Sequence, residues 1–175
     1  MDRLIFLSGF MGSGKSTLGK KLAALLNYDF IDLDGFIENH SGKSVTDIFK
    51  QEGESVFRQM ETDCLVSLFT KKSAVIALGG GTVCFNNNLA KIKEVGVLIY
   101  IELPAKTLAQ RVRSSKTERP LLDKLNDNEL VATIEKLLEE RQKFYKQSHL
   151  IVKGLNLTAQ DIYSALLEYS SKHNI

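Results

Sequence analysis

The chain has 175 residues, of which 43% are hydrophobic and 25% charged, and its formal net charge is +2. This length predicts one domain that buries roughly 70% of its unfolded surface and needs no disulfide or metal for stability. The nearly balanced charge gives no reason to expect nucleic acid or a membrane surface as a partner. Cys64 and Cys84 fit no disulfide or zinc pattern, and no apolar run suits a signal peptide or a membrane span, so we expect a cytoplasmic protein with reduced thiols.

The first motif along the chain is GFMGSGKS at residues 9–16, which matches the phosphate-loop pattern G-x-x-x-x-G-K-[ST]. It follows a buried strand predicted over residues 4–8 and precedes a helix predicted over residues 15–26. Its glycines allow successive backbone N–H groups to converge on a phosphate. We expect Lys15 to reach the β- and γ-phosphates and the Ser16 hydroxyl to ligate Mg²⁺. The predicted nucleotide-binding residues in this motif are Gly12, Ser13, Gly14, Lys15, Ser16 and Thr17. The alternative is a glycine-rich turn that binds nothing.

A second strand, predicted over residues 28–32, ends in the sequence DLDG at residues 32–35. Ligands of open α/β sheets bind at the carboxyl ends of strands, and residues two apart on an extended segment project to the same side. Asp32 is then placed to hold Mg²⁺ or its waters, and Asp34 can accept a proton from a substrate hydroxyl. The alternative is a turn in which Asp34 caps a helix that begins near residue 35.

The middle of the chain combines a helix predicted over residues 54–69 with a third strand over residues 74–78. On the helix, Arg58 and Glu61 are three residues apart and can pair, which is usually a solvated surface contact of little energy. The strand ends in three consecutive glycines at residues 79–81. Because glycines there cost backbone entropy, they indicate either close approach of the backbone to a ligand or a turn.

Two groups of basic residues follow in the second half of the chain. Arg111 and Arg113 end a helix that Pro104 opens, where basic residues most often complement the helix dipole. The polar segment 114–124 is long enough to act as a flap over a phosphate site, and Arg119 in its middle is either a phosphate ligand or a solvated loop charge. A long amphipathic helix predicted over residues 127–148 then carries Arg141 near its end.

The order of these elements predicts the fold. Further strands are predicted over residues 97–101 and 150–152, and further helices over residues 85–95 and 158–171. Alternating strands and helices imply right-handed parallel crossovers, and so an α/β fold in which a five-stranded, doubly wound parallel sheet forms the middle of three layers. We expect a single domain over residues 1–175 with a lid at about residues 114–124.

Taken in order, five features resemble the shikimate kinases, which are small-metabolite kinases of the nucleoside-monophosphate-kinase branch of the P-loop NTPase fold. The features are the loop at residues 9–16, the Asp32-x-Asp34 pair, the FRQME sequence at residues 57–61, the glycines at residues 79–81, and RPLL at residues 119–122 followed by Arg141-x-x-x-Tyr145. The resemblance covers nearly the whole chain.

The resemblance implies an enzyme that transfers the γ-phosphoryl group of ATP to the 3-hydroxyl of shikimate, with Mg²⁺ as cofactor and shikimate 3-phosphate and ADP as products. The implied shikimate-binding residues are Asp34, Arg58, Gly80 and Arg141. The implied catalytic residues are Lys15, Asp34 and Arg119, with Ser16 and Asp32 serving Mg²⁺. Two arginines suit the carboxylate of shikimate because each can form a forked pair with it, and Glu61 would orient Arg58.

Adenine binding is less determined by the sequence. In the family an arginine before the lid packs on adenine, and Arg111 and Arg113 compete for that role; we assign Arg113 to the nucleotide. Three other functions fit part of the pattern: a GTPase, because DLDG also satisfies D-x-x-G; a gluconate or nucleoside-monophosphate kinase; and a nucleotide-binding regulator. The chain contains no Asn-Lys-x-Asp guanine motif, which speaks against the GTPase. We expect a monomer whose partners are shikimate and ATP.

Overall fold

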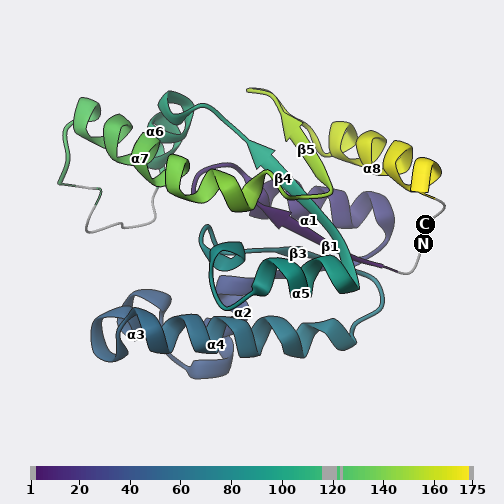
Figure 1. Cartoon of the computed structure of the whole chain (residues 1–175), viewed down its shortest axis with the longest axis horizontal. Helices are drawn as coiled ribbons and strands as arrows, with labels where there is room; N and C mark the ends of the chain where they lie inside the picture. Colours follow the sequence, from purple (N-terminus) through teal and green to yellow (C-terminus); the bar gives the residue numbers. More distant parts are fainter. Residues whose placement is uncertain (1–2, 116–121, 123, 174–175) are drawn as a thin grey trace.

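The computed structural model describes residues 3–115, 122 and 124–173, and Figure 1 shows the arrangement of its elements. In chain order the elements are β1 (Leu4–Ser8), α1 (Lys15–Leu26), β2 (Asp29–Asp32), α2 (Leu33–Ser41), α3 (Val45–Glu52), α4 (Glu54–Ser67), η1 (Leu68–Thr70), β3 (Ala74–Ala77), η2 (Thr82–Cys84), α5 (Asn88–Val95), β4 (Gly96–Glu102), α6 (Ala105–Ser114), α7 (Asp127–Tyr145), β5 (Leu150–Lys153) and α8 (Ala159–His173).

The five strands form one parallel sheet in the order β2-β3-β1-β4-β5. All five residues of β1 are buried, as its continuous apolar sequence predicted for a strand covered on both faces. Helices α1 and α8 lie side by side on one face of the sheet, whereas α4, α5 and α7 pack on the other (Figure 1). The predicted three-layer, doubly wound α/β fold is therefore confirmed.

A third apolar cluster joins α6 and α7 to the loop that follows β1. Phe10 of that loop is 1% exposed and packs with Leu108 of α6 and Ile134 of α7. Leu122, which lies within the predicted lid, is buried in the same cluster. This packing holds the α6–α7 pair next to the phosphate loop, so the beginning and the end of the predicted lid are anchored beside it.

Two predicted boundaries are wrong for a physical reason. Asp32, and not Asp34, is the N-cap of α2, because its carboxylate accepts the Gly35 N–H and the helix already begins at Leu33. The helix predicted from residue 85 begins only at Asn88, since Asn86 and Asn87 adopt left-handed backbone angles with φ of 51° and 58°. Asparagine tolerates that conformation better than most residues.

The other predicted boundaries differ from the observed ones by a few residues, mainly at frayed helix ends. Pro104 is the N-cap of α6 instead of its first helical residue. Within the described ranges, none of the helices combines the length and the apolar character that crossing a bilayer requires.

Candidate active site

The phosphate loop connects β1 to α1 with the geometry of an anion site. Gly12 and Gly14 have φ of 79° and 94°, which only glycine adopts without strain. Gly14 is the N-cap of α1 and has no side chain to bond the helix N–H groups, so these can serve a bound anion. The Lys15 ammonium donates to the carbonyls of Gly9 and Phe10 at 2.9 and 3.1 Å and therefore lies over the loop.

Two further predicted residues of this motif differ in exposure. Ser13 is buried and its backbone N–H bonds the Phe10 carbonyl, which closes the turn. Thr17 is exposed in the first turn of α1, on the helix end that faces the loop. The local sequence therefore folds as the phosphate-loop pattern requires.

Ser16 and Asp32 meet at the edge of this loop. The Ser16 hydroxyl donates to Oδ2 of Asp32 at 2.5 Å, while Oδ1 of the same carboxylate accepts the Gly35 N–H at 3.4 Å. Asp32 therefore caps α2 and also presents an oxygen toward the nucleotide side. A hydroxyl and a carboxylate are hard oxygen donors, which is the chemistry that Mg²⁺ prefers in proteins. The residue pair fits the predicted metal.

Asp34 lies in the first turn of α2, where its side chain is exposed to solvent but its carboxylate lies close to the glycine turn. Desolvation by the surrounding protein atoms, together with the negative charges of Asp32 and Glu61, raises the pKa of Asp34 from 3.8 to about 6, although the Lys15 ammonium opposes the shift. A Cβ added to Gly79 would come within 3.0 Å of the Asp34 carboxylate. This carboxylate therefore lies against the glycine turn, and its pKa is close to the range that suits a general base.

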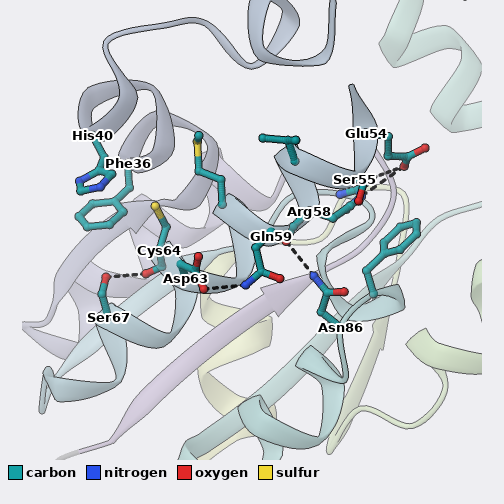
Figure 2. Close-up of a pocket in the computed structure, with 13 residues that line it drawn as sticks. Phe36, His40, Glu54, Ser55, Arg58, Gln59, Asp63, Cys64, Ser67 and Asn86 are labelled. Carbon is teal, nitrogen blue, oxygen red and sulfur yellow. Dashed lines mark hydrogen bonds and ion pairs between the residues drawn. The ribbon is translucent and has the colours of Figure 1, made fainter. Parts of the chain in front are cut away.

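Arg58 and Glu61 of α4 form a buried ion pair. Glu61 is 0% exposed, and its Oε2 accepts from Nη1 of Arg58 at 2.8 Å. Its Oε1 accepts from the Thr82 hydroxyl at 2.6 Å. Glu54 holds Nε and Nη2 of the same guanidinium at 3.3 and 3.2 Å, and Figure 2 shows Arg58 and Glu54 joined beside a groove along α4. The interpretation of the Arg58–Glu61 pair as a solvated surface contact is wrong.

The three glycines let side chains of α4 and α7 converge. A Cβ on Gly81 would lie 2.8 Å from Nη2 of Arg58, so a larger residue would displace the guanidinium. The Gly80 carbonyl accepts from Nη1 of Arg141 at 3.3 Å and from the Tyr145 hydroxyl. Of the two interpretations of this triplet, close approach to a site is the one that the contacts favour.

Three residues near these groups were given no function by the sequence, although Tyr145 belongs to the Arg141-x-x-x-Tyr145 feature. Tyr145 is fully buried, stacks on Tyr100 with ring centroids 4.7 Å apart, and orients the Gly80 carbonyl. Thr82 bonds both Glu61 and the Gly79 carbonyl. The ring of Phe85 lies over the Arg58 guanidinium. The sequence signals for these residues are the positions of Thr82 and Phe85 shortly after the glycines and the position of Tyr145 one helical turn after Arg141.

The two arginines before the lid point in different directions. Arg111 donates to the carbonyls of Ser13 and Leu155 at 3.4 and 2.9 Å and so lies beside the phosphate loop. Arg113 instead pairs with Asp127 at 3.2 Å and bonds the Leu125 carbonyl. This geometry favours Arg111 over Arg113 as the residue next to the predicted nucleotide site, and the assignment of Arg113 stays a prediction. Arg119 lies outside the described residues.

The site thus occupies the carboxyl edge of a parallel sheet, where a phosphate loop faces a perturbed carboxylate and two arginines. This combination defines a P-loop kinase that acts on a small molecule.

Comparison with known proteins agrees with the conclusion that the chain is a small-molecule kinase. The family model for shikimate kinase matches residues 11–170. A shikimate kinase of Chlorobium chlorochromatii is 42% identical, and the match covers 95% of this chain and 92% of that protein. The structure of shikimate kinase from Bacteroides thetaiotaomicron matches with a TM-score of 0.89 and 35% identity over 100% of both chains. That of shikimate kinase from Acinetobacter baumannii in complex with shikimate gives 0.87 and 32% over 100% of this chain and 96% of the other. The chain belongs to the shikimate kinase family.

Proposed function

We propose that this chain transfers the γ-phosphoryl group of ATP to the 3-hydroxyl of shikimate, giving shikimate 3-phosphate and ADP. The observation that carries the proposal is the convergence of Arg58 and Arg141 on the glycine turn, beside Asp34. Arginine binds carboxylates through paired N–H donors, and a carboxylate beside them can accept a hydroxyl proton. The acceptor is therefore a compact carboxylate that also bears hydroxyl groups.

The hydrogen bonds of Arg58 support its role as a ligand for that carboxylate. Of its five N–H donors, three bond Glu54 and Glu61 among the described residues, so two remain for a ligand. Arg141 is partly buried on the other side of the glycine turn, where its guanidinium lies 5.4 Å from the centroid of the Phe10 ring. Arg58 and Arg141 would hold the substrate, with Gly80 providing backbone contact.

The arrangement of these groups supports the following phosphoryl-transfer step. The acceptor hydroxyl gives its proton to Asp34 as its oxygen bonds the γ-phosphorus, and the bond from that phosphorus to the bridging oxygen of ADP breaks. The transition state is loose, so positioning and charge neutralisation provide most of the acceleration. Lys15 supplies positive charge at the phosphates, and we propose the same role for Arg119.

Ser16 and Asp32 are the residues that would hold Mg²⁺, since their oxygens form the hard donor pair described above. The ion would neutralise the phosphate charges of ATP. Gly12, Ser13, Gly14 and Thr17 would contact the same phosphates through the loop and the first turn of α1.

The decisive assay measures ADP release from Mg-ATP by the purified protein, with shikimate, quinate, gluconate and nucleoside monophosphates supplied separately. Turnover with shikimate, abolished by a chelator and restored by Mg²⁺, is the expected result. Release with gluconate or a nucleoside monophosphate would move the proposal to another kinase, and quinate turnover would widen the substrate. Absence of release with every acceptor would favour a nucleotide-binding regulator.

A matched pair of variants tests the nucleotide side. Arg111→Ala should raise the KM for ATP roughly three- to tenfold, because one cation beside the phosphate loop contributes on the order of 1 kcal/mol. Among the described residues, Arg113→Ala removes exposed contacts with Leu125 and Asp127, and it should leave that KM within about twofold. Steady-state kinetics with saturating shikimate compare the two, and the reverse ranking would restore Arg113 as the nucleotide ligand.

The cytoplasmic location and the monomeric state stay predictions from the sequence. Gel filtration with light scattering would measure the oligomeric state.

A further inference from the structure

Arg58 is surrounded by aromatic rings, and one of them does not belong to the core. The guanidinium carbon lies 5.8 Å from the ring centroid of Phe49, 5.1 Å from that of Phe57 and 4.2 Å from that of Phe85. Phe57 is 3% exposed and fills the core, whereas Phe85 is 36% exposed. The ring nearest to the cation is therefore held at the surface, where burial alone does not explain its position.

The turn that carries Phe85 is fastened to helix α4 at Arg58. The Asn86 amide donates to the Arg58 carbonyl and to the Thr62 hydroxyl, both at 3.0 Å, and Figure 2 shows Asn86 reaching the helix beside Arg58. The Asn86 carbonyl accepts from the Lys91 ammonium at 3.1 Å. Asn86 and Asn87 also adopt left-handed backbone angles, which restrict the backbone of the turn next to the bonded side chain.

The groups around the Arg58 guanidinium act on it in different ways. Glu54 and Glu61 occupy three of its N–H donors, and Gly81 approaches so closely that a side chain there would displace the guanidinium. A ring at 4.2 Å is within the distance at which an aromatic face attracts a cation. It also displaces water, and a less hydrated guanidinium binds an incoming carboxylate more strongly.

We propose that Phe85 is a positioning residue for the carboxylate of the substrate, because it covers the Arg58 guanidinium and holds its two remaining N–H donors toward the site. The inference rests on the proposed function, since it takes shikimate as the carboxylate. Phe85 acts through Arg58 and does not take part in phosphoryl transfer.

Replacement of the ring tests this role. Phe85→Ala should raise the KM for shikimate roughly three- to tenfold, the range of a partly desolvated cation–π contact, and leave kcat and the KM for ATP within about twofold. Phe85→Tyr should keep the wild-type KM, and Phe85→Leu, which restores apolar cover without a ring, should fall between. Leu167→Ala on α8 is the matched control, because it also truncates an exposed apolar side chain, 42% exposed, away from the site.

The anchoring amide provides a second variant. Asn86→Gly keeps the left-handed backbone available but removes the bonds to Arg58 and Thr62, and it should raise the same KM in the same direction by a smaller factor. In an Arg58→Lys background, Phe85→Ala should lose most of its effect, since the planar cation that it covers is gone.

The outcomes separate this inference from the proposed function. If the wild-type protein does not turn over shikimate, both are overturned. If it does, and Phe85→Ala keeps the wild-type KM for shikimate, only the role of Phe85 is overturned. If Phe85→Ala lowers kcat, changes both KM values by a similar factor and lowers the melting temperature, Phe85 serves general stability, and this result would overturn the inference as well.

Discussion

Replacement of Asp34 by asparagine is expected to lower kcat by about a hundredfold or more, the scale that a positioned general base contributes. The amide has nearly the size of the carboxylate but cannot accept the hydroxyl proton. Single-turnover measurements at saturating Mg-ATP and shikimate would isolate the chemical step. Turnover within about threefold of wild type would remove Asp34 from the mechanism and leave it a binding role only.

The raised pKa of Asp34 adds a signature in pH. As a base, Asp34 must be ionised, so kcat/KM of the wild-type protein should fall as the pH decreases through about 6. Asp34→Asn should lack this acid limb. A wild-type profile that is flat between pH 5 and pH 7.5, on the order of one unit to either side of that value, would contradict the assignment.

The same carboxylate should cost stability. Its pKa is about 6 in the folded protein against an ordinary 3.8, so the folded state binds more protons in this window and the unfolding free energy falls as the pH rises through it. Because the Asp34 side chain is exposed, solvent screening reduces this contribution. Asp34→Asn should therefore melt at a higher temperature than wild type at pH 7.5, and the gain should vanish below about pH 4. A variant that melts lower at neutral pH would contradict the raised pKa of Asp34.

Removal of either arginine that we propose as a shikimate ligand is expected to raise the KM for shikimate about 10- to 100-fold, because hydrogen bonds to charged groups contribute about 1.5–3 kcal/mol each. Arg58→Ala and Arg141→Ala should both show this effect with little change in the KM for ATP. Product-release assays with each substrate varied in turn would measure it. Loss of ATP affinity with intact shikimate affinity would place these arginines at the nucleotide instead.

The two variants should differ in stability. Arg58→Ala leaves the Glu61 carboxylate, which is 0% exposed, without its cation, and an unpaired buried charge costs about 3–5 kcal/mol. We expect its melting temperature to fall by roughly 10 °C, whereas Arg141→Ala orphans no carboxylate among the described residues and should lower it much less. The double variant Arg58→Ala/Glu61→Gln should recover the stability but not the KM. Recovery of both would show that Arg58 acts only by neutralising Glu61.

The interpretation of Arg58 shows where a sequence argument ends. A spacing of three residues on a helix predicted that Arg58 and Glu61 would pair, and they do. Whether the pair is solvated depends on which residues pack over it. Residues 79–85, which follow strand β3, pack against the pair and shield it from water. Sequence spacing therefore predicted the contact, while packing between distant segments decided its burial.

The arginines before the lid illustrate the same limit. Residues two apart on a helix point to nearly opposite sides, so Arg111 and Arg113 cannot both face the phosphate loop. Their composition and spacing do not say which side packs against the loop. The α6–α7 cluster around Phe10 decides it, since its contacts fix the rotation of α6 about its own axis.

The sequence by itself determined the phosphate loop, the glycine turn, the strand–helix alternation and, through the order of its motifs, the family. Each of these depends on backbone conformations and residue types that neighbouring positions specify. Only the tertiary structure decided that Asp32 caps α2, that the pKa of Asp34 is raised, that Arg111 lies at the loop, and that Phe85 covers Arg58. The physical reason is that burial and side-chain direction depend on which distant surfaces meet, and local sequence does not encode that.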